Sequence, residues 1–313
     1  MRICSLIPGA TEVITALGLE DQLVGVSHEC DFPPSVRQIP VMIEPLVKTE
    51  HTTSSNIDQR VNELVTTGHQ LYQLREEAFQ QARPDLILTQ DLCHVCSVTP
   101  DQLTKAMHSL QHPPAMLILS PTTLQDVIHD IERIAGAVGS VSKGETLAAN
   151  LRDRLDRVRL RLKKEVVRPR VVCLEWLDPL YVAGHWVPEM VDLAGGHNVL
   201  GSKDNPSYQT TWDDVVAAQP DVLIVMPCGY SVDRTLNELR QVGPVQTAWQ
   251  RAQRFRSDMY IVDAGSYFSR PGPRLVDGVE LLAAILHPDR DHPLDHAQAI
   301  KLKPSLLAGD SAL

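Results

Sequence analysis

The chain has 313 residues, 43% of them hydrophobic, which is enough apolar material for two domains of ordinary size. Its formal charge of -10 at pH 7 gives no basic footprint for phosphate backbones or anionic lipid, which argues against nucleic acid as a partner. No apolar stretch approaches the roughly 20 residues of a transmembrane helix, so membrane insertion is not expected.

Seven short apolar runs alternate with helical patterns along the chain. The runs are continuous in Val, Ile and Leu, which is typical of parallel strands covered by helices on both faces. The predicted strands are residues 2–7, 22–27, 86–90, 115–120, 170–176, 222–227 and 259–264. The pattern therefore predicts an α/β protein.

Three helix starts are indicated by their capping residues. A helix over 11–17 follows a Pro-Gly turn, and Thr99-Pro100-Asp101 starts another with proline in its first turn. Thr211 and Asp214 have the spacing of a capping box. These helices fit between the predicted strands.

A long amphipathic helix is predicted over residues 142–166, because leucine and valine recur there every three or four residues in an otherwise charged segment. At 1.5 Å per residue it spans roughly 35 Å, and Pro169 ends it. The segments 80–93 and 216–229 on either side resemble each other, so we expect two related lobes with parallel sheets. The predicted domains are an N-terminal lobe (1–124), a helical connector (125–168), a C-terminal lobe (169–287) and a loosely ordered tail (288–313).

The chain start and the cysteines predict a cytoplasmic protein. The sequence MRICSLIPG begins a β-like run at Arg2 without the charged, apolar and small-residue segments of a secretory signal. The six cysteines form no dense disulfide framework, which favours reduced thiols. If an export signal is missing from the sequence, the expected location is the periplasm.

The loops that follow the predicted strands are the candidate site, because ligands of open parallel sheets bind beyond the carboxyl ends of the strands. In the N-terminal lobe these loops carry small, thiol, imidazole and carboxylate groups. The candidate ligand-binding residues there are Pro8, Gly9, Thr11, His28, Glu29, Cys30, Asp31, Cys93 and His94.

The pair Cys93-x-x-Cys96 allows several interpretations. A stable disulfide is disfavoured in a reducing cytosol, and a thioredoxin-like centre needs its first thiol at a helix start. A tetrahedral zinc site needs four ligands, and His28 and Cys30 complete the set if the two loops meet. A lone cysteine is otherwise a small buried hydrophobe, which is the preferred interpretation inside the strands.

Aromatic residues concentrate in the C-terminal half, where 11 of the 14 lie after residue 170. Trp176 at a strand end fits core packing and a pocket equally well. Trp186 beside His185, and the loop 267–270, favour a pocket, because loops at strand ends carry function. The candidate ligand-binding residues of this half are Trp176, His185, Trp186, Tyr230, Tyr267 and Arg270.

Catalytic fingerprints are missing from the sequence. It contains no G-x-G-x-x-G, no G-x-x-x-x-G-K-[ST] and no G-x-S-x-G pattern, so phosphoryl transfer and serine hydrolysis lose their usual supports. No catalytic residue is predicted.

Three separated motifs resemble a known family. They are SLIPGATEVITALGLEDQLVGVSHECDFPP (5–34), LILTQDLCHVC (86–96) and FSRPGPRLVDGVELLAAILHP (268–288). With the long helix, they are similar to the cobalamin-binding, ABC-transporter substrate-binding branch of the periplasmic-binding-protein-like superfamily, which also includes iron-siderophore and haem binders. The resemblance covers roughly residues 1–287.

The resemblance implies a class III fold, with two Rossmann-like lobes joined by one backbone helix and a shallow cleft between the lobes. It also implies that aromatic side chains hold a corrin ring, for which Trp176, Trp186, Tyr208, Tyr230 and Tyr267 are the positional matches. Acidic residues that dock to permease arginines are implied as well, without an assignment in this chain.

The expected function is therefore non-catalytic binding of cobalamin or a related corrinoid or metal chelate in the interlobe cleft. One alternative is an intracellular metal-binding protein or metalloenzyme that uses the Cys/His cluster of the N-terminal lobe, with a transition metal such as zinc. Another is an iron-siderophore or haem receptor of an ABC importer.

Overall fold

A computed structural model describes residues 1–47, 49, 52–91, 103–104, 107, 113–162, 167–241, 257–288 and 295–302. The chain divides into two compact units. Unit 1 consists of Met1–Thr52, Gln59–Arg152 and Pro271–Pro273. Unit 2 consists of Thr53–Asp58, Asp153–Arg270 and Arg274–Leu313. The four predicted domains, with their boundaries, stay a prediction.

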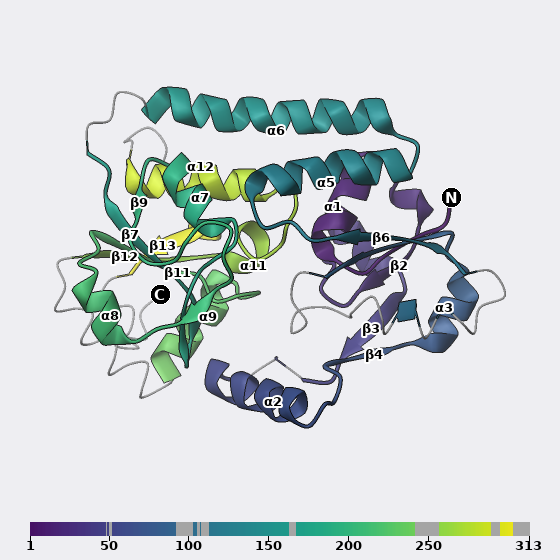
Figure 1. Ribbon diagram of the computed structural model, residues 1–313, viewed down its shortest axis with the longest axis horizontal. Helices are drawn as coiled ribbons and strands as arrows, with labels where there is room; N and C mark the ends of the chain where they lie inside the picture. The colour runs from purple at the N-terminus through teal and green to yellow at the C-terminus, as the bar shows by residue number, and fades with distance from the viewer. Residues whose placement is uncertain are drawn as a thin grey trace. The chain divides into compact units, whose positions relative to one another are not determined.

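Unit 1 is built on a sheet with strand order β4-β3-β2-β1-β5-β6, shown in Figure 1. All neighbouring strands are parallel except β3 and β4. The strands are β1 (Ile3–Ser5), β2 (Leu23–Ser27), β3 (Val41–Pro45), β4 (Tyr72–Leu74), β5 (Leu86–Gln90) and β6 (Ala115–Leu119).

Helices cover both faces of this sheet. Successive residues of a strand point to opposite faces. Ser5 contacts Thr11 of α1 (Pro8–Ala16), whereas Cys4 lies in an apolar cluster with Phe79 of α3 (Glu76–Ala82). Helices α1 and α3 therefore lie on opposite faces, and α5 (Leu124–Ala137) packs beside α1. This explains why the strands of unit 1 are apolar without alternation.

Unit 2 has a second sheet, with strand order β10-β8-β7-β11-β12-β13 and β9 paired to β7. Strands β7, β11 and β12 are parallel, and β8, β10 and β13 run antiparallel to their neighbours. The strands are β7 (Arg170–Leu177), β8 (Leu180–Val182), β9 (His197–Asn198), β10 (Tyr208–Gln209), β11 (Val222–Val225), β12 (Asp258–Val262) and β13 (Ala299–Lys301).

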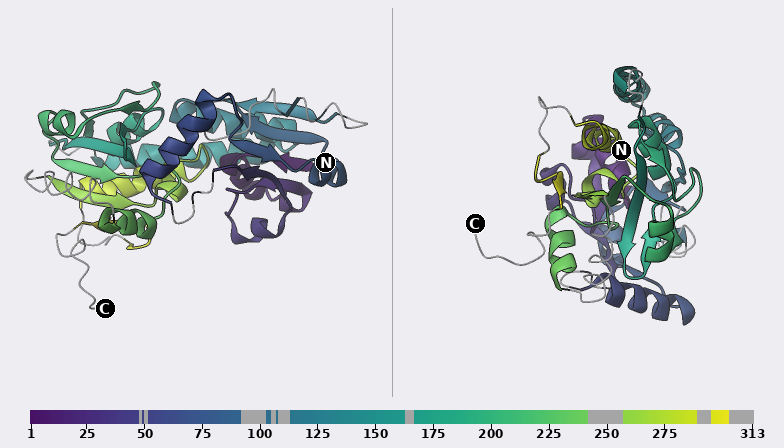
Figure 2. Two further views of the ribbon diagram at one scale, coloured as in Figure 1. Left: turned by 90° about the horizontal axis from the view of Figure 1, so that it is seen from below. Right: turned by 90° about the vertical axis from the view of Figure 1, so that its left-hand side faces the viewer.

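The second sheet is also covered on both faces. One face packs Val172 and Leu223 against Val215 of α8 (Trp212–Ala217) and Leu239 of α9 (Val232–Gln241). On the other face, Val171 lies with side chains of α7 (Val187–Leu193) and α12 (Leu275–Leu286). Figure 2 gives two further views of these layers.

All seven predicted strands are present, and the α/β class is confirmed. Strands β3, β4, β8, β9, β10 and β13 were not predicted from the sequence. The tail prediction is wrong at residues 299–301, because Ala299–Lys301 pairs with β12 and Ala299 is buried. Within the part of the chain that the structure describes, no helix is long and apolar enough to cross a membrane.

The predicted helix starts have different outcomes. The capping box of Thr211 and Asp214 is confirmed, with both reciprocal hydrogen bonds formed. The Pro-Gly turn before residue 11 is wrong, because α1 begins at Pro8. Proline suits this first position, since it has no backbone N–H to leave unsatisfied and its φ is already helical. The predicted start at Thr99–Asp101 lies outside the described residues.

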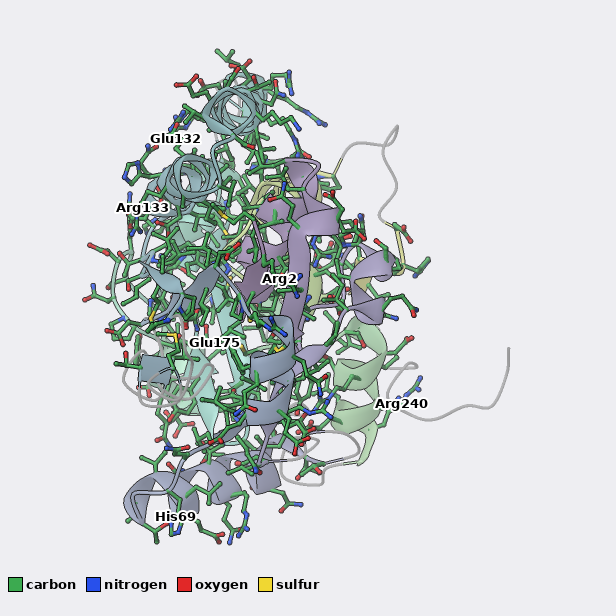
Figure 3. The ribbon with its side chains drawn as sticks, turned by 90° about the vertical axis from the view of Figure 1, so that its right-hand side faces the viewer. Arg2, His69, Glu132, Arg133, Glu175 and Arg240 are labelled. Atoms are coloured by element: carbon green, nitrogen blue, oxygen red, sulfur yellow. The ribbon has the colours of Figure 1, made fainter. Side chains whose placement is uncertain are left out.

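The long amphipathic helix is confirmed as α6 (Val141–Leu162). Leu151, Leu155 and Val158 on its apolar stripe are buried. In unit 1, Arg152 pairs with Glu132 of α5 at 2.9 Å, and Figure 3 shows Glu132 and Arg133 on that helix. In unit 2, Arg154 pairs with Asp277 and Glu280 of α12. The boundary between the units falls inside α6, so one continuous helix belongs to both.

Two of the three sequence motifs meet in unit 1, where Gly9 of α1 packs on the backbone of Pro271 and Gly272. A Cβ atom added at Gly9 would lie 1.9 Å from the Pro271 carbonyl oxygen, whereas nothing lies within 4 Å of a Cβ at Gly136 of α5. Gly9 is therefore required by close approach of two backbones.

We expect Gly9→Ala to lower the free energy of unfolding by about 1 to 3 kcal/mol, because the methyl group overpacks a backbone contact. The matched control Gly136→Ala should be neutral or stabilise by up to about 1 kcal/mol, since alanine is the better helix former. Urea unfolding of both variants measures the difference. Equal stability of the two variants would contradict the contact.

Candidate ligand-binding site

The order of strands in unit 1 places a switch point between β1 and β5. From β1 the chain builds β2 and β3 on one side, and then β5 and β6 on the other. The loops after β1 and β5 therefore diverge at the carboxyl edge, which is where ligands bind in open α/β sheets. Pro8, Gly9 and Thr11 follow β1, and Cys93, His94 and Cys96 follow β5 but lie outside the described residues.

A buried cluster of hydroxyl groups surrounds the Cys30 thiol at this edge. The Thr11 hydroxyl lies 2.8 Å from Ser5 Oγ and 3.1 Å from Cys30 Sγ, and Ser27 Oγ lies 3.2 Å from the same sulfur. The side chains of Ser5, Thr11, Ser27 and Cys30 are all at most 5% exposed. Thr11 and Cys30 therefore join α1 to the ends of β1 and β2, and their side chains face the interior.

His28 and its neighbours lie on the more exposed side of the same loop. His28 Nε2 is 3.4 Å from Glu29 Oε1, and the side chains are 23% and 49% exposed. The His28 ring also lies 5.8 Å, between centroids, from Tyr72 at the start of β4. Asp31 is half-buried. These side chains, together with the half-buried Pro8, form the accessible polar rim of unit 1.

The zinc set His28, Cys30, Cys93 and Cys96 stays a prediction, since two of its four members lie outside the described residues. Among the residues that the structure describes, no group of three or more His, Cys, Asp or Glu side chains is placed to hold a metal ion. Burial of Cys30 against Thr11 and Ser27 would have to be relieved for its sulfur to reach a metal.

A depression in unit 1 lies elsewhere, beside β4 and α3. It has a volume of about 1060 Å³ and is lined by charged and amide side chains, among them Glu44, Gln73 and Glu77. None of the predicted site residues lines it. Its polar and open character differs from the apolar pocket that a flat macrocycle needs.

Unit 2 has its own switch point, between β7 and β11. Trp176 lies near the carboxyl end of β7 and Tyr230 follows β11, so the two rings flank the point where the chain changes direction. Their centroids are 5.6 Å apart at an interplanar angle of 68°, which is a favourable edge-to-face contact. Tyr230 is 1% exposed, whereas Trp176 is half-buried. The buried tyrosine thus holds an accessible indole ring in place.

Two charged residues behind Tyr230 were missed by the sequence analysis. The Arg234 guanidinium lies 3.6 Å from the centroid of the Tyr230 ring, a cation–π contact. Burial, followed by the negative charge of Glu238, raises the pKa of Tyr230, so the phenol stays protonated at neutral pH. Arg234 and Glu238 are spaced by four on α9, as neighbours on a helix face are, and Tyr230 lies in the loop just before this helix. The spacing of the two charged residues was the available signal.

Glu238 also binds the segment of unit 2 that comes from early in the chain. Its carboxylate accepts a hydrogen bond from the backbone N–H of Ser54, at the start of α2 (Ser54–Thr66), with a length of 2.7 Å. Ser54 is fully buried and Glu238 is 7% exposed. A carboxylate at a helix N-terminus is favourable, because it satisfies a free N–H and faces the positive end of the dipole.

The loop after β12 packs against the Tyr230 loop. Ser269 Oγ accepts a hydrogen bond from Gly229 N at 3.0 Å, and Gly265 N donates to the Tyr230 carbonyl oxygen at 3.1 Å. Tyr267 and Arg270, on and just after the short helix α11 (Ala264–Tyr267), are half-buried. These contacts bring Trp176, Tyr230, Tyr267 and Arg270 to one carboxyl edge of unit 2.

Trp186 reaches the same loop from inside the fold. Its indole N–H donates to the Phe268 carbonyl oxygen at 2.8 Å, and the side chain is 5% exposed. His185 before it has a φ of 52° and is half-buried, and burial lowers the pKa of its imidazole. Trp186 therefore packs in the core at the start of α7, and its role is to position the Phe268 loop.

Tyr208 lies apart from this edge in the hydrogen-bond pattern of the sheet. It is on the short strand β10, is 44% exposed, and its hydroxyl accepts a hydrogen bond from Gly201 N at 3.3 Å. Tyr208 is paired with Val182 and Gln209 with Tyr181. Its proposed contact with a ligand stays a prediction.

The described cysteines differ sharply in accessibility, so we expect different reactivities. Cys4, Cys30 and Cys173 are buried, and desolvation raises the pKa of the Cys4 and Cys173 thiols. Cys228, beside the aromatic edge, is exposed. Iodoacetamide should alkylate Cys228 at least about tenfold faster than these three in the folded protein.

Peptide mass spectrometry reads each cysteine separately, and labelling in urea gives the unfolded reference. The variant Cys228→Ser should lose the fast site among these four and leave the slow ones unchanged. Labelling of Cys4 or Cys173 as fast as Cys228 in the folded protein would contradict the burial described above.

Comparison with known proteins places these features in a family context. The vitamin B12-binding protein of Vibrio cholerae is 26% identical over 288 residues, which cover 91% of this chain and 88% of the relative. The vitamin B12-binding protein of Yersinia pestis is 26% identical over 235 residues, covering 74% and 71% of the two chains.

Solved structures confirm the fold. A periplasmic haem-binding protein from Pseudomonas aeruginosa has a TM-score of 0.70 at 19% identity and covers 96% of this chain and 97% of its own. The periplasmic vitamin B12-binding protein of Vibrio cholerae has a TM-score of 0.64 at 23% identity, covering 91% and 97%. The class III arrangement, two α/β lobes joined by one long helix, is thereby confirmed.

The predicted cytoplasmic location is wrong. The family described as "Periplasmic binding protein" matches residues 3–244, and this family and the B12-binding relatives point to the periplasm. Proteins of this kind bind a substrate for ABC transporters and are not catalysts, which confirms the expectation of non-catalytic binding. Since the match extends over more than half of its length, the chain belongs to the periplasmic binding protein family.

Proposed function

We propose that the protein binds cobalamin or a closely related corrinoid and delivers it to an ABC permease. The curated relatives that match 91% of the chain are vitamin B12-binding proteins, and this likeness in sequence favours a corrinoid over other metal chelates. The haem-binding structure from Pseudomonas aeruginosa shares the fold at only 19% identity, so its ligand does not bear on the choice of ligand for this chain.

The observation that carries the proposal is the accessible Trp176 ring held edge-on by Tyr230 at the switch point of unit 2. A corrin ring is flat, with apolar faces and an edge of amide groups. An indole face in a fixed orientation suits such a face, and half-buried polar groups such as Arg270 suit the edge.

The exposure of each side chain decides which predicted residues we propose to contact the ligand directly. Pro8, His28, Glu29, Asp31, Trp176, His185, Tyr208, Tyr267 and Arg270 keep partly or fully exposed side chains. Gly9, Thr11, Cys30, Trp186 and Tyr230 are buried, and we propose that they support the loops instead. Cys93 and His94 lie outside the described residues, and their contacts with the ligand stay predictions. The position of the ligand between the lobes also stays a prediction.

The magnitude expected for Trp176 follows from area. Covering about 100 Å² of indole at about 25 cal/mol per Å² gives about 2.5 kcal/mol, or roughly 60-fold in affinity. We therefore expect Trp176→Ala to weaken cyanocobalamin binding by about 10- to 100-fold. Trp176→Phe keeps a flat ring and should lose less than about tenfold.

Isothermal titration with cyanocobalamin, cobinamide and haemin measures these affinities, and thermal unfolding checks that both variants fold. Tighter binding of the two corrinoids than of haemin is the expected result. Absence of binding to either corrinoid at tens of micromolar would sink the proposal, and preferential binding of haemin would replace it by the haem-receptor alternative.

A further inference from the structure

The C-terminal half of α6 carries a concentration of positive charge that the chain-wide balance conceals. Residues 152–162 of α6 contain five Arg and two Asp, a local charge of +3, whereas the formal charge of the whole chain is -10.

The helix directs part of this charge away from unit 2. Leu151, Leu155 and Val158 are buried, and Arg154 on the same side binds Asp277 and Glu280 of α12. With 3.6 residues per turn, the residues between them must face outward. The outward residues form what we call the basic face: Arg157, Arg159, Leu160 and Arg161, all exposed.

Figures 1 and 2 show this half of α6 running over α12 on the outside of unit 2. The Leu160 side chain is 61% exposed on the basic face, and Val167 beyond the helix is 75% exposed. Asp153 and Asp156 also face outward, and Asp156 pairs with Arg159 at 3.3 Å. Asp153 precedes the basic face by about one turn, whereas Asp156 borders it, one turn before Leu160, and offsets part of the charge of Arg159.

General properties of surface helices account for part of this charge pattern. Arginines in the last turn of a helix complement its dipole, and a single exposed leucine is common on protein surfaces. They do not account for a large exposed aliphatic side chain with three exposed arginines within one turn of it. That combination, a cationic rim around an apolar tip, is typical of helices that lie on membrane surfaces.

We propose that the basic face of α6 binds the surface of an anionic phospholipid bilayer, with Leu160 entering the headgroup region. Guanidinium groups bind phosphate oxygens in a bidentate manner, and their charge is attracted by acidic headgroups. At physiological ionic strength the Debye length is about 8 Å, so the negative charge on the rest of the chain is largely screened from the bound surface.

Duplex nucleic acid is the less favoured occupant. An exposed aliphatic side chain at the centre of the face has nothing to contact on a phosphate backbone, whereas it gains free energy in the lipid interface. The proposal is independent of cobalamin binding, and it predicts that a binding protein of this kind stays close to the membrane in which a permease lies.

The test is co-sedimentation of the full chain with vesicles. Vesicles with roughly one third phosphatidylglycerol in phosphatidylcholine should bind the protein at 0.1 M salt, and pure phosphatidylcholine vesicles should not. The triple variant Arg157→Glu, Arg159→Glu, Arg161→Glu should weaken binding at least about tenfold. The charge-matched control Arg37→Glu, Arg60→Glu, Arg83→Glu changes exposed arginines of unit 1 and should bind like the wild type.

A second variant, Leu160→Asn, separates insertion from charge and should weaken binding without altering its salt dependence. Thermal unfolding confirms that each variant folds. Equal binding to neutral and anionic vesicles, no binding to either, or equal effects of the two triple variants would each overturn the proposal. Tighter binding to duplex DNA than to anionic vesicles would reassign the basic face to nucleic acid.

Discussion

The edge-to-face contact of Trp176 with Tyr230 is the interaction on which the account of the site depends. It exists because β7 and β11 are adjacent parallel strands from which the chain departs in opposite directions, so that both rings lie at the same carboxyl edge of the sheet. Tyr230 is fixed from behind by the cation of Arg234 and by the packing of the Ser269 loop. A ring that is already held in place loses little entropy when a ligand covers it, which favours tight binding.

The two units differ in which of their thiol, imidazole and aromatic side chains are buried and which are accessible. In unit 1 the thiol of Cys30 contacts two hydroxyl groups and is buried, whereas His28 and Glu29 keep accessible side chains. In unit 2 the aromatic residues divide into buried supports, such as Trp186, and an accessible Trp176. Side chains of the same type therefore support the fold where they are buried in the core, and they are available to a ligand where they remain accessible to solvent.

Sequence reasoning recovered the elements that carry strong periodic signals. The strand Leu86–Gln90 was predicted to the residue, because it is a continuous buried apolar run. The long helix α6 (Val141–Leu162) begins within one residue of the predicted start, because its apolar stripe recurs with the helical period. Short antiparallel strands such as β8 and β10 were missed, since two or three residues show no period and pair only through tertiary contacts. Among the cysteines at strand ends, the sequence could not tell the buried Cys30 from the exposed Cys228, because burial depends on which helix packs above each loop.

The position of Trp176 in a complex can be observed directly by NMR of protein labelled with ¹⁵N-tryptophan, titrated with cyanocobalamin. The account predicts that the indole resonance of Trp176 moves strongly on binding, and that Trp212, which packs against the core of unit 2 from α8, changes little. A saturable complex in which the Trp176 resonance keeps its position would contradict the central claim that this ring contacts the corrinoid.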